Sequence, residues 1–193
     1  MAQAFRRKGE RYLARMDAQE REIVVGLLVQ ARDLLALDEA PSSGDPLRDL
    51  LDGLGRSPAS QQEIAQRDPA LRRLLPRASR DDDDVATDFR ELAENNIRRA
   101  KAAHLQVAIA VLSFDKGSKV DLDHEQAKSL MIGIGDVRLI LADRLDIQSD
   151  EDAEKLHERV GFDRDTDLQT LFAAYYEFFT WLQESLAQTL TVR

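Results

Sequence analysis

The last stretch of the chain, residues 168–190, constrains the fold more than any other. The sequence contains seven Phe, three Tyr and one Trp, and six of these aromatic residues fall between Phe172 and Trp181. Apolar residues recur there at three- and four-residue steps, the spacing of one face of an amphipathic helix. They are Leu168, Leu171, Phe172, Tyr175, Phe179, Leu182, Leu186 and Leu190. Because a helix gains most of its stability by packing such a face, the rest of the chain must provide a groove for it.

The composition is that of a globular protein. The chain has 193 residues, of which 43% are hydrophobic and 33% charged, so we expect a single domain over residues 1–193. Cysteine is absent, which excludes disulfides and thiolate metal sites. The amino terminus has no apolar run suited to a signal peptide, so we expect a soluble, cytoplasmic protein. The net charge of −9 argues against broad binding to nucleic acid or to anionic membranes.

The first 16 residues predict a short β-hairpin. Tyr12, Ala14 and Met16 recur at every second residue after a break at Lys8 and Gly9, which is the period of a strand. A loose basic arm is the alternative, because chain ends are often poorly ordered.

Four longer helices are predicted, covering about residues 17–37, 83–114, 123–145 and 168–190. Residue pairs typical of a capping box mark the starts of three of them: Asp17 with Glu20, Asp123 with Gln126, and Thr166 with Gln169. We therefore predict a mainly α fold, an irregular helical bundle with a small N-terminal β-hairpin.

Shorter elements connect these helices. Residues 38–80 are predicted to form a connector that crosses the bundle and contains short helices after Asp45-Pro46 and Asp68-Pro69. A short acidic helix is expected over residues 149–159.

The helix over residues 83–114 carries Asn96 on its expected apolar face. That face consists of Val85, Phe89, Leu92, Asn96, Ala100, Ala103, Val107, Val111 and Phe114. A buried amide needs hydrogen-bond partners, so we expect Asn96 to join a core network, with Arg138 as a candidate partner. Beyond Leu105 the helix is apolar nearly all round, and its second half is predicted to lie in the centre of the bundle.

Arg138 is the most informative single residue. Helical geometry places it on the apolar stripe of its helix, between Ile134 and Leu141, where arginine is rare unless paired. We expect a structural ion pair with a carboxylate on another helix, or a side chain that extends to solvent; the alternative is an anion-binding group at the base of a pocket. Asp136 is predicted to lie on the far, solvated face. Gly133 and Gly135 indicate close approach to another element.

Other candidate sites are weaker. The run Asp81–Asp84 suits a helix start better than a metal site. Glu154 and His157 match half of a di-iron motif that requires further ligands. Basic residues in segments 67–80 and 98–101 lack interleaved aromatic residues and are expected on solvated faces or in intramolecular pairs. No catalytic residue, cofactor site or metal site is predicted.

Phe178 and Trp181 fall at the edge of the apolar stripe of the last helix. Trp and Tyr are enriched at binding hot spots, so this edge is a candidate interface, with ordinary core packing as the alternative.

Several segments together resemble the actinobacterial family catalogued as domain of unknown function 2017. They are FRRKGERYLARMD (5–17), RDPALRRLLPRASRDDDD (67–84), DFRELAENNIRRAK (88–101), GDVRLILADRLDI (135–147) and YEFFTWLQESL (176–186). The resemblance implies a helical, intracellular, non-enzymatic protein, and links some members to oxidative-stress transcription through cysteines and sigma-factor contacts. Family members commonly have Asn where this chain has Gly135, and this chain has no cysteine for a thiol switch.

We therefore expect a regulatory protein–protein interaction module with a protein partner, one candidate being the transcription machinery, or with a second copy of itself. The alternatives are a DNA-binding regulator that uses segments 67–80 and 98–101, and a small-molecule-binding protein or enzyme with a pocket around Arg138. Nucleic acid and membrane are not the expected partners.

Overall fold

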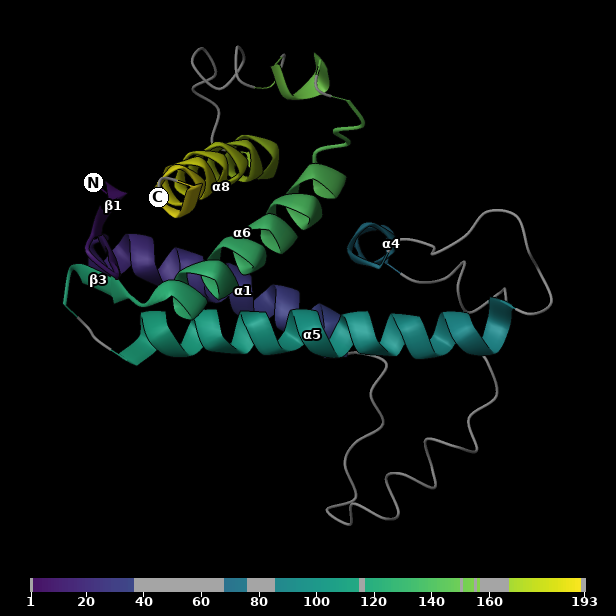
Figure 1. The fold of residues 1–193 in the computed structure, drawn as a ribbon. Helices are drawn as coiled ribbons and strands as arrows, with labels where there is room; N and C mark the ends of the chain where they lie inside the picture. The colour runs from purple at the N-terminus through teal and green to yellow at the C-terminus, as the bar shows by residue number, and fades with distance from the viewer. Residues whose placement is uncertain are drawn as a thin grey trace.

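The computed structural model describes residues 2–36, 68–75, 86–114, 117–149, 151–154, 156 and 167–191; within the helix over residues 86–114, side chains are described from residue 96 onward. The fold is mainly α, as predicted, with a small antiparallel sheet near the N-terminus (Figure 1). The helices are α1 (Ala18–Ala36), α4 (Pro69–Leu74), α5 (Ala86–Phe114), α6 (His124–Arg144) and α8 (Leu168–Thr191), and the strands are β1 (Gln3–Lys8), β2 (Arg11–Arg15) and β3 (Lys119–Leu122).

The predicted N-terminal hairpin is confirmed. Gly9 has a φ of 61°, a conformation that glycine adopts without strain, and it turns the chain between β1 and β2. The sheet has a third strand that was not predicted, because β3 pairs with β2 in the order β1-β2-β3. In β3, Val120 and Leu122 alternate with Lys119 and Asp121, which is the period of a strand. The alternation covers only four residues, too few to predict a strand from sequence.

Capping explains where the helices begin. Glu20 N donates to Asp17 Oδ1 and Asp17 N donates to Glu20 Oε2 at the start of α1, which is a capping box. The same reciprocal pair joins Asp123 and Gln126 at α6, as predicted.

Aspartates also cap α4 and α8. Asp68 caps α4, with Pro69 in the first turn, again as predicted. Thr166 lies outside the described residues, and Asp167 caps α8 by accepting a hydrogen bond from Thr170 N.

Helix α6 is the central element of the described fold. It contacts α8, α5, α4 and α1, and the inner face of the sheet packs at its first turns. Figure 1 shows α6 crossing in front of α1, with α5 along one side and α8 along the other. Gly133 lies at the crossing, where an added Cβ would meet Leu28 Cδ2 at 3.0 Å and Leu105 Cδ2 at 3.3 Å. The close approach predicted for this glycine is therefore confirmed.

One core runs through these elements. Its fully buried side chains include Met16 after β2, Leu28 and Leu35 of α1, Leu105 and Leu112 of α5, Ile134 of α6, and Phe179, Leu182 and Leu186 of α8. The last helix thus packs its apolar face as expected, but its first turn departs from the prediction, because Leu168 is 70% exposed and Leu171 is 39% exposed. None of the helices among the described residues is both long and apolar enough to span a membrane.

Some predicted elements lie outside the described residues. These are the short helix after Asp45, the acidic run Asp81–Asp84, and most of the expected helix over 149–159, of which residues 151–154 are described and helical. The connector is described only at residues 68–75.

Candidate functional site

Arg138 lies in a groove between α6 and α8. Its Nη1 donates to Gln183 Oε1 at 2.5 Å, and its Nη2 donates to the Tyr176 hydroxyl at 3.3 Å. The guanidinium carbon also lies 5.2 Å from the centroid of the Tyr176 ring, within the range of a cation–π interaction. The groove has a volume of about 450 Å³, and Ile132 and Leu139 supply part of its apolar lining.

The expected ion pair of Arg138 is wrong. No carboxylate among the described residues lies within ion-pair distance of its guanidinium, and its buried Nε has no hydrogen-bond partner there. Both residues that hold the guanidinium, Gln183 and Tyr176, are neutral. The guanidinium therefore has no ion-pair partner among the described residues. Asp136 also lines the groove, but its carboxyl is bonded to Lys101, so Arg138 can receive an anionic group.

Gly135 makes room for this arrangement. A Cβ at this position would lie 3.0 Å from Gln183 Nε2, and that Nε2 donates to Met131 O at 3.4 Å. The close approach predicted for Gly135 is thus confirmed, with a side chain of α8 as the neighbour.

Asp136 is buried, not solvated as predicted. Its residue exposure is 2%, and its Oδ1 accepts a short hydrogen bond from Lys101 Nζ on α5. Burial raises the pKa of the Asp136 carboxyl, and the Lys101 hydrogen bond and charge oppose this effect only in part. The prediction failed because α6 has neighbours on several sides: the face opposite Arg138 meets α5 instead of water.

Asn96 is exposed, so its predicted place in a core network is wrong. From residue 96 onward, α5 buries the opposite face, which carries Arg98, Leu105, Ala108, Ile109 and Leu112. The predicted central position of its second half is wrong in part, because Val107 is 39% and Phe114 is 92% exposed. Where a helix is apolar nearly all round, its sequence does not indicate which face is buried. The buried face also contains the basic Arg98, and Lys101 pairs with the buried Asp136, so this face did not look apolar in the sequence.

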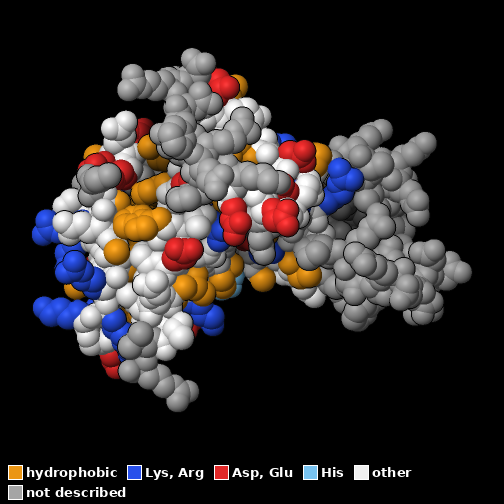
Figure 2. All heavy atoms as spheres, turned by 90° about the horizontal axis from the view of Figure 1, so that it is seen from above, with side chains coloured by type: hydrophobic (Ala, Val, Ile, Leu, Met, Phe, Trp, Pro, Cys, Tyr) orange, Lys and Arg blue, Asp and Glu red, His pale blue; other side chains and the backbone are white. Residues whose placement is uncertain are grey.

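Phe178 and Trp181 form an aromatic pair on the outer side of α8. Their ring centroids are 6.0 Å apart with an interplanar angle of 26°, and Trp181 is 38% exposed. Phe178 also meets the buried Phe179 ring edge-on, so the pair is anchored on the core. In Figure 2, which looks onto the α8 side, hydrophobic side chains gather on the surface over this helix.

Two buried arginines were not predicted. Arg21 of α1 is 7% exposed and donates to Leu112 O at 2.9 Å, Gly117 O at 2.6 Å and Lys119 O at 3.1 Å. Arg98 of α5 is 4% exposed and donates to Leu35 O at 2.6 Å. Both bind carbonyls near helix C-termini, where the unsatisfied C=O groups and the helix dipole favour a cation.

The basic segments 67–80 and 98–101 are largely engaged within the fold where the structure describes them. Arg73 pairs with Asp143 at 3.2 Å, Arg98 binds Leu35 O, and Lys101 pairs with Asp136. Arg72 and Arg99 are exposed, and Arg67, Arg77 and Arg80 lie outside the described residues.

Each of the two described histidines contacts a hydroxyl group from another element. His104 Nδ1 lies 3.1 Å from Ser129 Oγ, and His124 Nδ1 lies 3.0 Å from the Tyr12 hydroxyl. His157, the partner of Glu154 in the half-motif, lies outside the described residues. Within the described part of the chain, no group of three or more His, Asp and Glu side chains converges as metal ligands would.

The fold and these sites define a mainly helical protein that carries a groove lined by Arg138 and Asp136 and an exposed aromatic pair. The chain belongs to the family described as a domain of unknown function, DUF2017, whose model matches residues 2–190. Neither the curated proteins nor the solved structures contain a match to this chain.

Proposed function

We propose that this chain is a non-enzymatic protein–protein interaction module whose partner covers the outer side of α8. A second copy of the chain is the first partner to test. The resemblance described above supports a finer proposal, a regulatory role in stress-linked transcription in the cytoplasm, with a component of the transcription machinery as the partner.

One observation carries this proposal: α8 has apolar side chains on two sides. On the inner side, Phe179, Leu182 and Leu186 are buried in the core. On the outer side, Trp181 and Leu171 are exposed to solvent beside Phe178. Exposing a stacked aromatic pair to water is unfavourable at about 25 cal/mol per Å² of apolar surface. Trp and Tyr are enriched at interface hot spots, so a partner that buries the pair would gain this free energy.

Light scattering of the wild-type chain and of Trp181→Glu tests the proposal. We expect the wild type to self-associate with rising concentration and the variant to remain monomeric with an unchanged melting temperature. Gln188→Glu is a matched control, because it adds the same charge at an exposed position of the same helix. If both variants associate like the wild type, the outer side of α8 is not the interface.

Arg138 supports a second candidate function, the binding of a small anionic molecule. Its guanidinium has only neutral partners, and it lines a groove with an apolar wall. Such a groove suits a carboxylate attached to an apolar body, because the two halves of the ligand would meet unlike surfaces. Calorimetric titration with a medium-chain fatty acid, compared between the wild type and Arg138→Gln, tests this candidate.

The DNA-binding alternative receives less support. It relied on segments 67–80 and 98–101, and the fold already uses Arg73, Arg98 and Lys101 for internal contacts.

A further inference from the structure

The outer face of the small sheet is strongly cationic. Residues that pair across antiparallel strands share one face, and the register places Arg6 beside Leu13, Lys8 beside Arg11, and Arg15 beside Lys119. The inner face, by contrast, is buried through Tyr12, Ala14, Val120 and Leu122. We call the exposed set Arg6, Lys8, Arg11, Arg15 and Lys119 the cationic sheet face. In Figure 2, Lys and Arg side chains gather at the edge of the molecule where β1 and β3 lie in Figure 1.

This charge is not balanced on the sheet. Asp121 pairs with Arg11 and with Lys119, each at 2.7 Å, and these two cations lower the pKa of its carboxyl. No carboxylate among the described residues pairs with Arg6, Lys8 or Arg15. The five cations and Asp121 sum to +4 in a chain of net charge −9, so all the other residues together carry −13.

The arrangement does not help the sheet to fold. Like charges directly opposite each other on neighbouring strands are destabilising, and two of the register pairs, Lys8 with Arg11 and Arg15 with Lys119, are of this kind. Charged residues can also protect edge strands from aggregation. However, Arg11 and Arg15 lie on the central strand β2, where edge protection does not apply. Arg11 is paired with Asp121, whereas no carboxylate among the described residues offsets Arg15, so the charge of Arg15 on β2 points to an anionic ligand.

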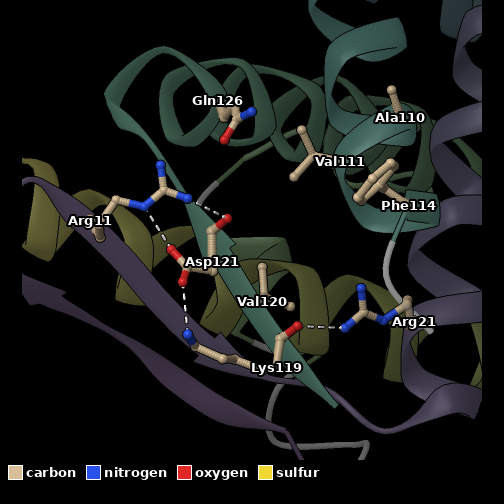
Figure 3. Close-up of a pocket in the computed structure, with 9 residues that line it drawn as sticks. All are labelled: Arg11, Arg21, Ala110, Val111, Phe114, Lys119, Val120, Asp121 and Gln126. Atoms are coloured by element: carbon tan, nitrogen blue, oxygen red, sulfur yellow. Dashed lines mark hydrogen bonds and ion pairs between the residues drawn. The ribbon is translucent and has the colours of Figure 1, made fainter. Parts of the chain in front are cut away.

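An apolar surface adjoins the cationic sheet face. A cavity of about 620 Å³ lies beside β3 and is lined by Arg11 and Lys119 together with Val111 and Phe114 from the end of α5. Figure 3 shows Arg11 and Lys119 on either side of Asp121, with Val111 and Phe114 across the cavity. The Phe114 ring is 92% exposed, so it makes almost no contribution to the core. A ligand for this surface gains most if it carries both carboxylates and an apolar side chain.

We propose that the cationic sheet face and the cavity beside β3 together bind an acidic peptide segment of a partner protein, which places carboxylates against Arg15 and Lys119 and an apolar side chain against Phe114. This surface contains no residue of α8, so it is separate from the Phe178 and Trp181 pair.

Charge and shape favour a peptide over nucleic acid. The outer face of the sheet carries Leu13 at its centre, and the adjoining cavity offers a single exposed aromatic ring, that of Phe114, whereas successive bases of a single strand stack on several aromatic side chains. A long phosphate backbone would also extend beyond the sheet over a surface whose net charge is negative. A short acidic segment avoids both problems.

Fluorescence anisotropy with the full chain tests the proposal. The probe is a fluorescein-labelled peptide in which Glu alternates with Phe and Leu. Two matched peptides replace either every Glu with Gln or every Phe and Leu with Ser, and a labelled single-stranded DNA of equal charge is the fourth probe. We expect the first peptide alone to bind well, and its affinity to fall as salt screens the charges.

Variants locate the binding surface. We expect Arg15→Glu/Lys119→Glu and Phe114→Ser each to weaken binding of the first peptide about tenfold or more, equivalent to about 1.4 kcal/mol. Arg6→Glu/Arg15→Glu is a second charge variant that keeps the Lys119–Asp121 pair intact and so guards against misfolding. Arg72→Glu/Arg99→Glu changes the net charge by the same amount at exposed positions away from the sheet, and its affinity should stay within about twofold of wild type because net charge alone acts weakly at a distance in salt.

Four outcomes would overturn the proposal. The first is no binding of the first peptide, and the second is equal binding of its Gln form. Another is an equal loss in the Arg72→Glu/Arg99→Glu control, which would mean that net charge alone attracts the peptide. The last is tighter binding of the DNA with loss in the sheet variants, which would make this face a nucleic-acid surface.

Discussion

Arg21 and Arg98 hold α1 and α5 together by a reciprocal contact. Arg21 near the start of α1 donates to Leu112 O in the last turn of α5, and Arg98 of α5 donates to Leu35 O in the last turn of α1. The two helices are antiparallel, so each one supplies a buried cation to the C-terminal end of the other. The contact places positive charge where the helix dipole is negative.

Replacing either arginine is therefore predicted to destabilise the fold. Arg21→Ala would remove the donor to Leu112 O and Arg98→Ala the donor to Leu35 O, so we expect each to lower the free energy of unfolding by about 1–3 kcal/mol. Arg99→Ala is the control, because Arg99 is exposed. Urea denaturation measures all three; an unchanged midpoint for Arg98→Ala would contradict the assignment.

Gly133 and Gly26 form a matched pair of helical glycines. A methyl group at Gly133 would press on Leu28 and Leu105, whereas nothing lies within 4 Å of a Cβ at Gly26. We expect Gly133→Ala to cost about 1–3 kcal/mol through overpacking. Gly26→Ala should instead stabilise α1 by about 0.5–1 kcal/mol. Thermal melting of both variants checks the prediction, and a stabilised Gly133→Ala would show that α6 packs less closely than described.

Arg138→Ala is expected to have a moderate effect on stability. Its partners Gln183 and Tyr176 are neutral, so we expect a loss of about 1–3 kcal/mol from the hydrogen bonds. Removing one member of a buried ion pair would cost more, about 3–5 kcal/mol. Chemical denaturation distinguishes the two, and a loss in the higher range would indicate a carboxylate partner.

Asp136 makes stability depend on pH in a defined direction. Its pKa is raised above the usual value of 3.8, so the folded chain holds this proton more tightly than the unfolded chain does. The stabilisation from the protonated form is complete below pH 3.8 and is lost as pH rises through the folded pKa. In Asp136→Asn the titratable carboxyl is absent, so this contribution to the pH dependence is absent too. The free energy of unfolding of the wild type should therefore fall relative to that of the variant as pH rises from 3.8. A relative rise over the same range would show that Lys101 more than offsets the burial.

The elements that could be predicted from sequence have strong local signals. The caps at Asp17, Asp68 and Asp123, the turn at Gly9 and the buried half of α8 all follow from residues close together in the chain. The hairpin and the helices α1, α4, α6 and α8 are confirmed, whereas the short helix predicted after Asp45 lies outside the described residues.

The side-chain environments depended on tertiary neighbours and were harder to predict. Asp136 was placed in solvent because its partner Lys101 lies on a different helix. Asn96 was placed in the core because it shares a helix face with Val107 and Phe114, which the fold leaves exposed. The arginine–carbonyl contacts left no pattern in the sequence, since a backbone carbonyl can accept from any residue. The site at Arg138 could be located, but its neutral partners on α8 could not.

Trp181 offers the most direct test of the proposed interaction function, because it is the only tryptophan in the chain and lies in the proposed interface. Its fluorescence quenching by acrylamide, measured with light scattering over a wide range of protein concentration, reports whether the outer side of α8 becomes covered. We predict that quenching falls and the emission shifts to shorter wavelength as the chain associates. A chain that stays monomeric, with quenching that is independent of concentration, would contradict self-association. If Trp181→Glu and Gln188→Glu then also captured the same proteins from a cell extract as the wild type, the outer side of α8 would not be an interaction surface.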